Sequence, residues 1–109
     1  MEQPFLSVVI PAFNEDRRID LTLERVVSYL GQQDYSWEVL VVDDGSTDET
    51  SSIAEKWTHV VKEVRLEKIP HGGKGWAVKN GMIAATGNYR FMCDADLAMP
   101  IEQLEIFID

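Results

Sequence analysis

The chain has 109 residues, of which 45% are hydrophobic and 27% are charged. These values are typical of one soluble globular domain and exclude a disordered segment, a collagen-like repeat and a disulfide scaffold. The net charge of −9 disfavours a nucleic-acid partner, and no apolar run approaches the roughly 20 residues of a membrane span.

Short apolar runs rich in β-branched residues alternate with helical segments along the chain. Phe5–Ile10 predicts a strand that ends at Pro11, and Val39–Val42 predicts a second strand. Between them, apolar residues recur at three- and four-residue spacing, which predicts a helix over 18–32.

The next two elements are shorter. Ser46 and Glu49 match a capping box, which predicts a helix that starts near Thr47 and a Ser46 side chain that serves only this helix. Val64–Ile69 alternates weakly between apolar and charged residues, which is typical of an edge strand.

A third helix and a fourth strand follow. Small residues favour a helix over Gly73–Thr86 that stops at Gly87, and Tyr89–Cys93 predicts a strand in which Cys93 is a buried small hydrophobe. Pro100 predicts the start of a last helix. Strands that alternate with helices indicate an α/β fold with three α/β/α layers and a mainly parallel sheet.

Ligand sites in such sheets lie at the carboxyl ends of the strands. We therefore expect the site in four loops that hold most of the unusual polar and glycine residues: 11–15, 43–48, 71–75 and 94–98.

Asp94 and Asp96 follow the fourth predicted strand. In extended chain, two carboxylates two residues apart project to the same side, which suits Mg²⁺ or Mn²⁺ shared with substrate phosphates. The alternative is a solvated turn in which an aspartate caps the next helix.

Asp43, Asp44 and Gly45 follow the second predicted strand. Asp43 is a candidate acceptor for a nucleobase N–H or a ribose hydroxyl, and Gly45 permits a tight turn and close approach of a ligand. A simple turn before a helix is the alternative.

Residues 71–75, His-Gly-Gly-Lys-Gly, open the third helix and predict an anion site made of backbone N–H groups, with Lys74 as a charge partner for phosphate. The segment lacks the spacing of a P-loop and of the dinucleotide fingerprint. The alternative is a flexible loop, and we expect His71 to be a solvated loop residue.

The loop after the first strand offers two side chains to a nucleotide. Phe13 is placed to lie against a base and Glu15 to bind ribose. In the alternative, Asn14 and Glu15 merely begin the first helix.

Four motifs together resemble the family 2 glycosyltransferases, in the order and at the spacing of that family. They are 8–15 (VVIPAFNE), 41–48 (VVDDGSTD), 73–75 (GKG) and 94–96 (DAD). Within the family, the chain is most similar to the polyprenyl-phosphate glucosyltransferases and mannose synthases.

The resemblance implies the nucleotide-binding half of a GT-A fold, with strand order 3-2-1-4 and a crevice between the first and fourth strands. It implies that Asp94 and Asp96 bind the metal and that Asp94 also reaches ribose. The residues implied in nucleotide-sugar binding are Pro11, Phe13, Glu15, Asp43, Asp44, Lys74 and Asp94.

The resemblance also implies the partners: a nucleoside diphosphate sugar, expected to be a uridine one, Mg²⁺ or Mn²⁺, and a polyprenyl phosphate or glycan acceptor. Ala98 stands where mannose synthases often carry a further polar ligand, which favours the glucosyl branch. We expect a cytoplasmic location, with the full-length protein associated with the cytoplasmic face of a membrane.

We further expect residues 1–109 to be the N-terminal part of a larger domain, because the acceptor-binding half of the family, with any catalytic base and membrane anchor, lies beyond the matched motifs. The chain alone should then bind nucleotide without transferring sugar. It should also self-associate through an apolar terminal surface formed by Ile101, Leu104, Phe107 and Ile108.

Three other functions stay open at this point. A nucleotidyltransferase also uses paired carboxylates and metal, but its glycine-rich loop should follow the first strand. A signalling receiver carries its acidic pair after the first strand, whereas Asp43 and Asp44 follow the second. A non-catalytic nucleotide-binding module differs from an enzyme only in sequence beyond this chain.

Overall fold

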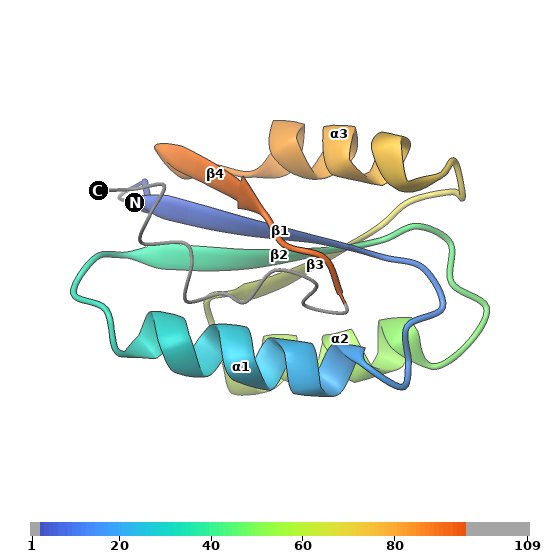
Figure 1. The fold of residues 1–109 in the computed structure, drawn as a ribbon, viewed down its shortest axis with the longest axis horizontal. Helices are drawn as coiled ribbons and strands as arrows, with labels where there is room; N and C mark the ends of the chain where they lie inside the picture. Colours follow the sequence, from blue (N-terminus) through green and yellow to red (C-terminus); the bar gives the residue numbers. More distant parts are fainter. Residues whose placement is uncertain (1–2, 96–109) are drawn as a thin grey trace.

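The computed structural model describes residues 3–95. In chain order, the elements are β1 (Leu6–Ala12), α1 (Ile19–Gly31), β2 (Trp37–Asp43), α2 (Thr50–Val60), β3 (Val64–Lys68), α3 (Lys74–Ala84) and β4 (Tyr89–Met92). The strands form one parallel sheet in the order β3-β2-β1-β4. Helices α1 and α2 cover one face of the sheet and α3 covers the other (Figure 1). The predicted three-layer fold and its strand order are confirmed.

The two central strands are buried on both faces. Val8 and Ile10 of β1 pack in an apolar cluster with α1 and α2, whereas Val9 packs with Ala77 of α3 in a second cluster. Because neighbouring strand residues face opposite layers, both layers require apolar side chains. The strands are therefore continuous apolar runs rather than alternating ones.

The prediction that β1 ends at Pro11 is wrong, since the strand continues to Ala12. The Ala12 carbonyl accepts a hydrogen bond from Asp44 of the β2 side, and the Val9 carbonyl accepts one from Cys93 of the β4 side. The backbone N–H and C=O groups of successive strand residues point toward opposite neighbouring strands. Those of Ala12 point toward β2 and those of Val9 toward β4, so the backbone nitrogen of Pro11 also points toward β4. Pairing with β4 ends at Val9, so Pro11 lies where no ladder hydrogen bond is lost.

The predicted capping box is also wrong. Helix α2 begins at Thr50 rather than near Thr47, and the Ser46 hydroxyl accepts a hydrogen bond from the Asn14 backbone N–H at 2.8 Å. The Asp48 carboxylate accepts the Thr50 backbone N–H at 2.9 Å and satisfies an amide at the start of the helix. A contact between two loops has therefore replaced the local cap.

Helix α3 lies so close to the sheet that Gly81 has no room for a side chain. A Cβ at residue 81 would lie 2.4 Å from Val9 Cγ1 and 2.9 Å from Val42 Cγ2. We expect Gly81→Ala to lower the free energy of unfolding by about 1–3 kcal/mol, because the helix must move off the sheet.

Gly75, in the first turn of the same helix, is the matched control because a Cβ there would meet no atom within 4 Å. Gly75→Ala is expected to raise the free energy of unfolding by about 0.5–1 kcal/mol through helix propensity. Urea unfolding measures both variants. Equal stability of the two would show that α3 does not depend on this close approach.

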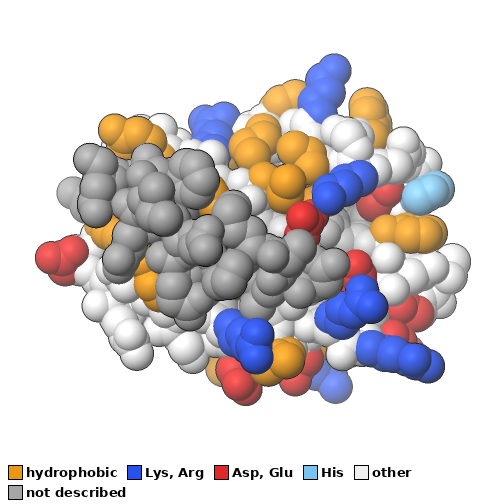
Figure 2. All heavy atoms as spheres, in the orientation of Figure 1, with side chains coloured by type: hydrophobic (Ala, Val, Ile, Leu, Met, Phe, Trp, Pro, Cys, Tyr) orange, Lys and Arg blue, Asp and Glu red, His pale blue; other side chains and the backbone are white. Residues whose placement is uncertain are grey.

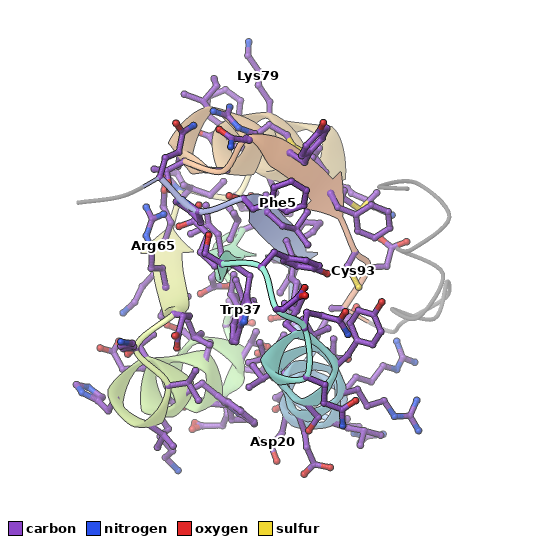
Figure 3. The ribbon with its side chains drawn as sticks, turned by 90° about the vertical axis from the view of Figure 1, so that its left-hand side faces the viewer. Phe5, Asp20, Trp37, Arg65, Lys79 and Cys93 are labelled. Carbon is purple, nitrogen blue, oxygen red and sulfur yellow. The ribbon has the colours of Figure 1, made fainter. Side chains whose placement is uncertain are left out.

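A polar network is buried at the amino ends of the strands, on the side of the molecule that faces the viewer in Figure 3. The Glu38 carboxylate accepts hydrogen bonds from the Ser7 hydroxyl at 2.6 Å, the Thr86 backbone N–H at 2.7 Å and Arg65 Nη1 at 2.5 Å. The Gly87 N–H in turn donates to the Ser7 hydroxyl at 2.8 Å. Burial opposes ionisation of Glu38, but these hydrogen bonds outweigh it and lower the pKa of the carboxyl.

Several predictions concern residues outside the described range: Asp96 as a metal ligand, the helix that begins at Pro100 and the apolar terminal surface. Within residues 3–95, no helix has the length and apolar character needed to cross a membrane.

Candidate functional site

A cleft of about 300 Å³ lies where the carboxyl ends of the strands meet their loops. The loops after β1, β2 and β3 lie at the same end of the molecule (Figure 1), where positively and negatively charged side chains gather (Figure 2). The lining residues are Pro11, Ala12, Phe13, Glu15, Asp44, His71, Gly73, Lys74, Ala77, Asp94 and Ala95. Six of the seven residues predicted to bind the nucleotide sugar therefore line one cleft.

Asp43 is the exception. Its side chain is buried, its Oδ1 accepts the Ser46 backbone N–H at 3.1 Å, and it is not one of the residues that line the cleft. Its contact with a base or ribose stays a prediction.

Asp44 shapes the loop that joins β3 to α3. Its carboxylate is buried, and its two oxygens accept the backbone N–H groups of Gly72 and Gly73, each at 2.9 Å. Gly45, in the left-handed region with φ 76°, passes so close that a Cβ there would lie 2.9 Å from the His71 backbone nitrogen. The glycine-rich segment is thus held against the end of β2, rather than being a loop without tertiary contacts.

His71 is a site residue that the sequence did not predict. Its ring stacks on Phe13 with centroids 4.3 Å apart and an interplanar angle of 29°. Its Nδ1 lies 3.0 Å from the Asp44 carbonyl oxygen and 3.1 Å from Asp44 Oδ2. The expected exposure of this loop histidine is confirmed, but the side chain also joins Phe13 in the cleft wall, which the sequence did not predict. Its position before two glycines was the available signal.

Lys74 and Asp94 meet across the cleft. Lys74 Nζ lies 2.6 Å from Asp94 Oδ1, which joins the first residue of α3 to the segment after β4. Both side chains keep part of their surface exposed, so both can also contact a ligand. The N-terminus of α3 adds the positive end of the helix dipole at the same place.

The loop after β1 is fixed to the loop after β2. Asn14 adopts a left-handed conformation with φ 52°, and its Oδ1 accepts the Thr47 N–H at 2.8 Å. The Glu15 N–H donates to the Thr50 hydroxyl at 2.8 Å. These contacts hold Phe13 and Glu15 in the cleft wall. Neither Asn14 nor Glu15 begins the first helix, because α1 starts at Ile19.

Asp48 stabilises the same pair of loops. Its carboxylate accepts hydrogen bonds from the Thr50 hydroxyl and backbone N–H and from the Asp16 backbone N–H. Burial opposes ionisation, but these hydrogen bonds together outweigh it, so the pKa of Asp48 is lowered.

The residues that the structure describes do not by themselves form a metal site. Residues 3–95 hold no group of three or more His, Cys, Asp or Glu side chains that could bind a metal ion. Asp94 places carboxylate oxygens in the cleft wall, and oxygen donors of this kind fit Mg²⁺ or Mn²⁺. Its role as a metal ligand together with Asp96 stays a prediction.

Comparison with known proteins gives the family. The sequence profile of Glycosyl transferase family 2 matches residues 7–109. The dolichyl-phosphate beta-glucosyltransferase of Saccharomyces cerevisiae is 39% identical over 99% of this chain and 34% of its own length. That of Homo sapiens is 36% identical over 92% of this chain and 33% of its own length. The chain thus spans about a third of these relatives.

Solved structures agree with the fold. TarS from S. aureus in complex with UDP-GlcNAc superposes with a TM-score of 0.73 at 28% identity, covering 95% of this chain and 31% of that one. A mannosyltransferase from Pyrobaculum calidifontis in complex with GDP-Man and Mn²⁺ superposes with a TM-score of 0.71 at 29% identity, covering 94% and 30%. The chain has the parallel sheet and covering helices of a GT-A fold, and it belongs to glycosyl transferase family 2.

Proposed function

We propose that this chain is the donor-binding part of an inverting glycosyltransferase that takes a sugar from a uridine diphosphate sugar. The observation that carries the proposal is the Lys74–Asp94 ion pair in the same cleft as the Phe13–His71 stack. An aromatic wall suits a base, whereas a lysine, a helix N-terminus and a carboxylate suit a diphosphate. In this assignment Glu15 binds ribose, and Asp44 acts by holding the loop.

The full-length protein would pass the sugar to a polyprenyl phosphate, with glucose as the favoured sugar. Relatives that carry the name dolichyl-phosphate beta-glucosyltransferase support this assignment. The acceptor phosphate is already anionic at pH 7, so its oxygen attacks the anomeric carbon with little help from a general base. We place this reaction at the cytoplasmic face of a membrane.

A divalent cation held by Asp94 and Asp96 would neutralise the charge that develops on the departing diphosphate. Mg²⁺ and Mn²⁺ are both candidates. Lys74 holds the Asp94 carboxylate in the cleft wall and provides positive charge beside the diphosphate.

Calorimetric titration of the 109-residue chain tests this proposal. We expect UDP to bind more tightly than ADP. Asp43 is the predicted acceptor for a nucleobase N–H, and a base that leaves this buried carboxylate without that hydrogen bond costs about 1–3 kcal/mol of binding free energy. We expect Mn²⁺ to strengthen the binding of UDP, since two carboxylates alone are a poor cage and the diphosphate supplies further oxygens.

Asp96→Ala should remove the Mn²⁺ effect and leave UDP affinity without metal unchanged. Glu24→Gln, a change of an exposed carboxylate on α1, is the control that should change neither value. Equal affinities for UDP and ADP would refute the assignment of the base. A full Mn²⁺ effect in Asp96→Ala would refute the assignment of the metal ligand.

A further inference from the structure

Contacts from both layers of the fold hold the chain as it leaves β4. The Cys93 N–H donates to the Val9 carbonyl at 2.9 Å and extends the pairing with β1. On the α3 side, Lys74 holds Asp94. On the α1 side, the Thr22 hydroxyl donates a hydrogen bond to the carbonyl oxygen of Ala95. Figure 3 shows Cys93 where the chain passes from β4 toward α1.

The contact of Thr22 differs from what a helical threonine normally makes. A threonine hydroxyl inside a helix can bond a carbonyl of the preceding turn or point to solvent. Here the Arg18 carbonyl accepts the Thr22 backbone N–H, while the hydroxyl reaches a residue 73 positions away in sequence. Thr22 and Ala95 are each 3% exposed, so water does not replace this hydrogen bond.

Packing alone does not require a hydroxyl at this position. The neighbours of Thr22 on the inner face of α1 are Ile19, Leu23 and Val26, which are all fully buried and apolar. Valine has nearly the same shape as threonine and would fill this space without a polar atom to satisfy. The hydroxyl therefore has a specific role, which is to hold the Ala95 carbonyl.

We propose that Thr22 is a positioning residue for the acidic segment that binds the divalent cation. This inference rests on the proposed function. The carbonyl of Ala95 lies between the two aspartates of the segment in sequence. The hydrogen bond from Thr22 fixes the Ala95 carbonyl, which directly follows Asp94 in the chain. Lys74 holds the Asp94 carboxylate from the opposite layer. The side chain and backbone of this segment therefore lose less conformational freedom when the cation and diphosphate bind.

Thr22→Val removes the donor and keeps the shape, whereas Thr22→Ser keeps the donor. For each variant, UDP affinity is measured by calorimetry with and without Mn²⁺, and thermal unfolding is followed separately. We expect the factor by which Mn²⁺ raises UDP affinity to be about tenfold smaller in Thr22→Val than in wild type. A loss of this size is typical when a group that supports a metal ligand is removed. UDP affinity without metal should be unchanged, and Thr22→Ser should retain the wild-type Mn²⁺ effect.

A merely structural threonine would lower the unfolding temperature and leave the Mn²⁺ effect intact, and that result would overturn the inference. If Thr22→Val does not fold, Thr22→Ala removes the same donor, leaves room for water at the Ala95 carbonyl and is judged by the same criterion. A wild-type chain without any Mn²⁺ effect would overturn the proposed metal site together with this inference. A full Mn²⁺ effect in both donor-free variants would overturn the inference alone.

Discussion

Glu38→Gln is expected to lower the free energy of unfolding at pH 7 by about 3 kcal/mol, although residue 38 lies at the end of the sheet opposite the cleft. The carboxylate accepts hydrogen bonds from Ser7, Arg65 and Thr86, and its side chain is only 8% exposed. The amide of glutamine keeps one acceptor oxygen and turns an NH₂ group toward donors. Urea unfolding at pH 7 measures the difference.

The same carboxylate predicts a pH dependence. The folded-state pKa of Glu38 lies below its ordinary value of 4.5, so its contribution to stability is fully present above that pH. The contribution is lost as the pH falls through the lowered folded-state pKa. The free energy of unfolding of wild type should therefore fall more steeply in acid than that of Glu38→Gln. The difference between these two free energies should become smaller below pH 4.5.

Glu24→Gln on the exposed side of α1 is the matched control. Its free energy of unfolding should equal that of wild type both at pH 7 and below pH 4.5. Asp48, whose pKa is also lowered, is present in all three proteins, so the comparison between them removes its contribution. A Glu38→Gln protein as stable as wild type at pH 7 would show that the network adds nothing to stability. A stability difference that acid does not change would show that the negative charge of Glu38 is not what stabilises the fold.

Asp44→Asn should weaken UDP binding by at least about tenfold while the chain stays folded. The carboxylate of Asp44 accepts two backbone N–H groups of the β3–α3 loop, and hydrogen bonds to a charged group contribute about 1.5–3 kcal/mol each. Asparagine has one acceptor oxygen and turns an NH₂ group toward the other N–H. The loop that brings His71 and Lys74 into the cleft would then lose its anchor.

Calorimetry gives the affinity, and hydrogen exchange gives the state of the loop. The amides of Gly72 and Gly73 should exchange faster in Asp44→Asn, which a purely direct contact between Asp44 and the ligand would not cause. Glu38→Gln is the matched control, because it lowers stability at the other end of the sheet and should keep UDP affinity. Wild-type UDP affinity in a folded Asp44→Asn protein would refute the role of the loop.

The order and type of the elements could be predicted because they depend on local patterns. Strands buried on both faces must be continuously apolar, and helices that cover a sheet must repeat their apolar residues every three to four positions. Ligands bind at the carboxyl ends of parallel strands, and this rule alone predicts that the loops after the strands form one site. Phe13, Glu15, Lys74 and Asp94 indeed line the same cleft.

The tertiary structure decided where polar side chains find their partners, because these pairs join residues far apart in sequence. Ser46 matched a local cap, yet its hydroxyl accepts the N–H of Asn14, 32 residues away. His71 has the sequence context of a solvated loop residue, but the fold places its ring on Phe13. Thr22 occupies a core position of α1, and only the packed fold gives its hydroxyl the Ala95 carbonyl as a partner. Buried polar groups must be paired, but hydrophobic periodicity carries no information about which partner the folded chain brings to them.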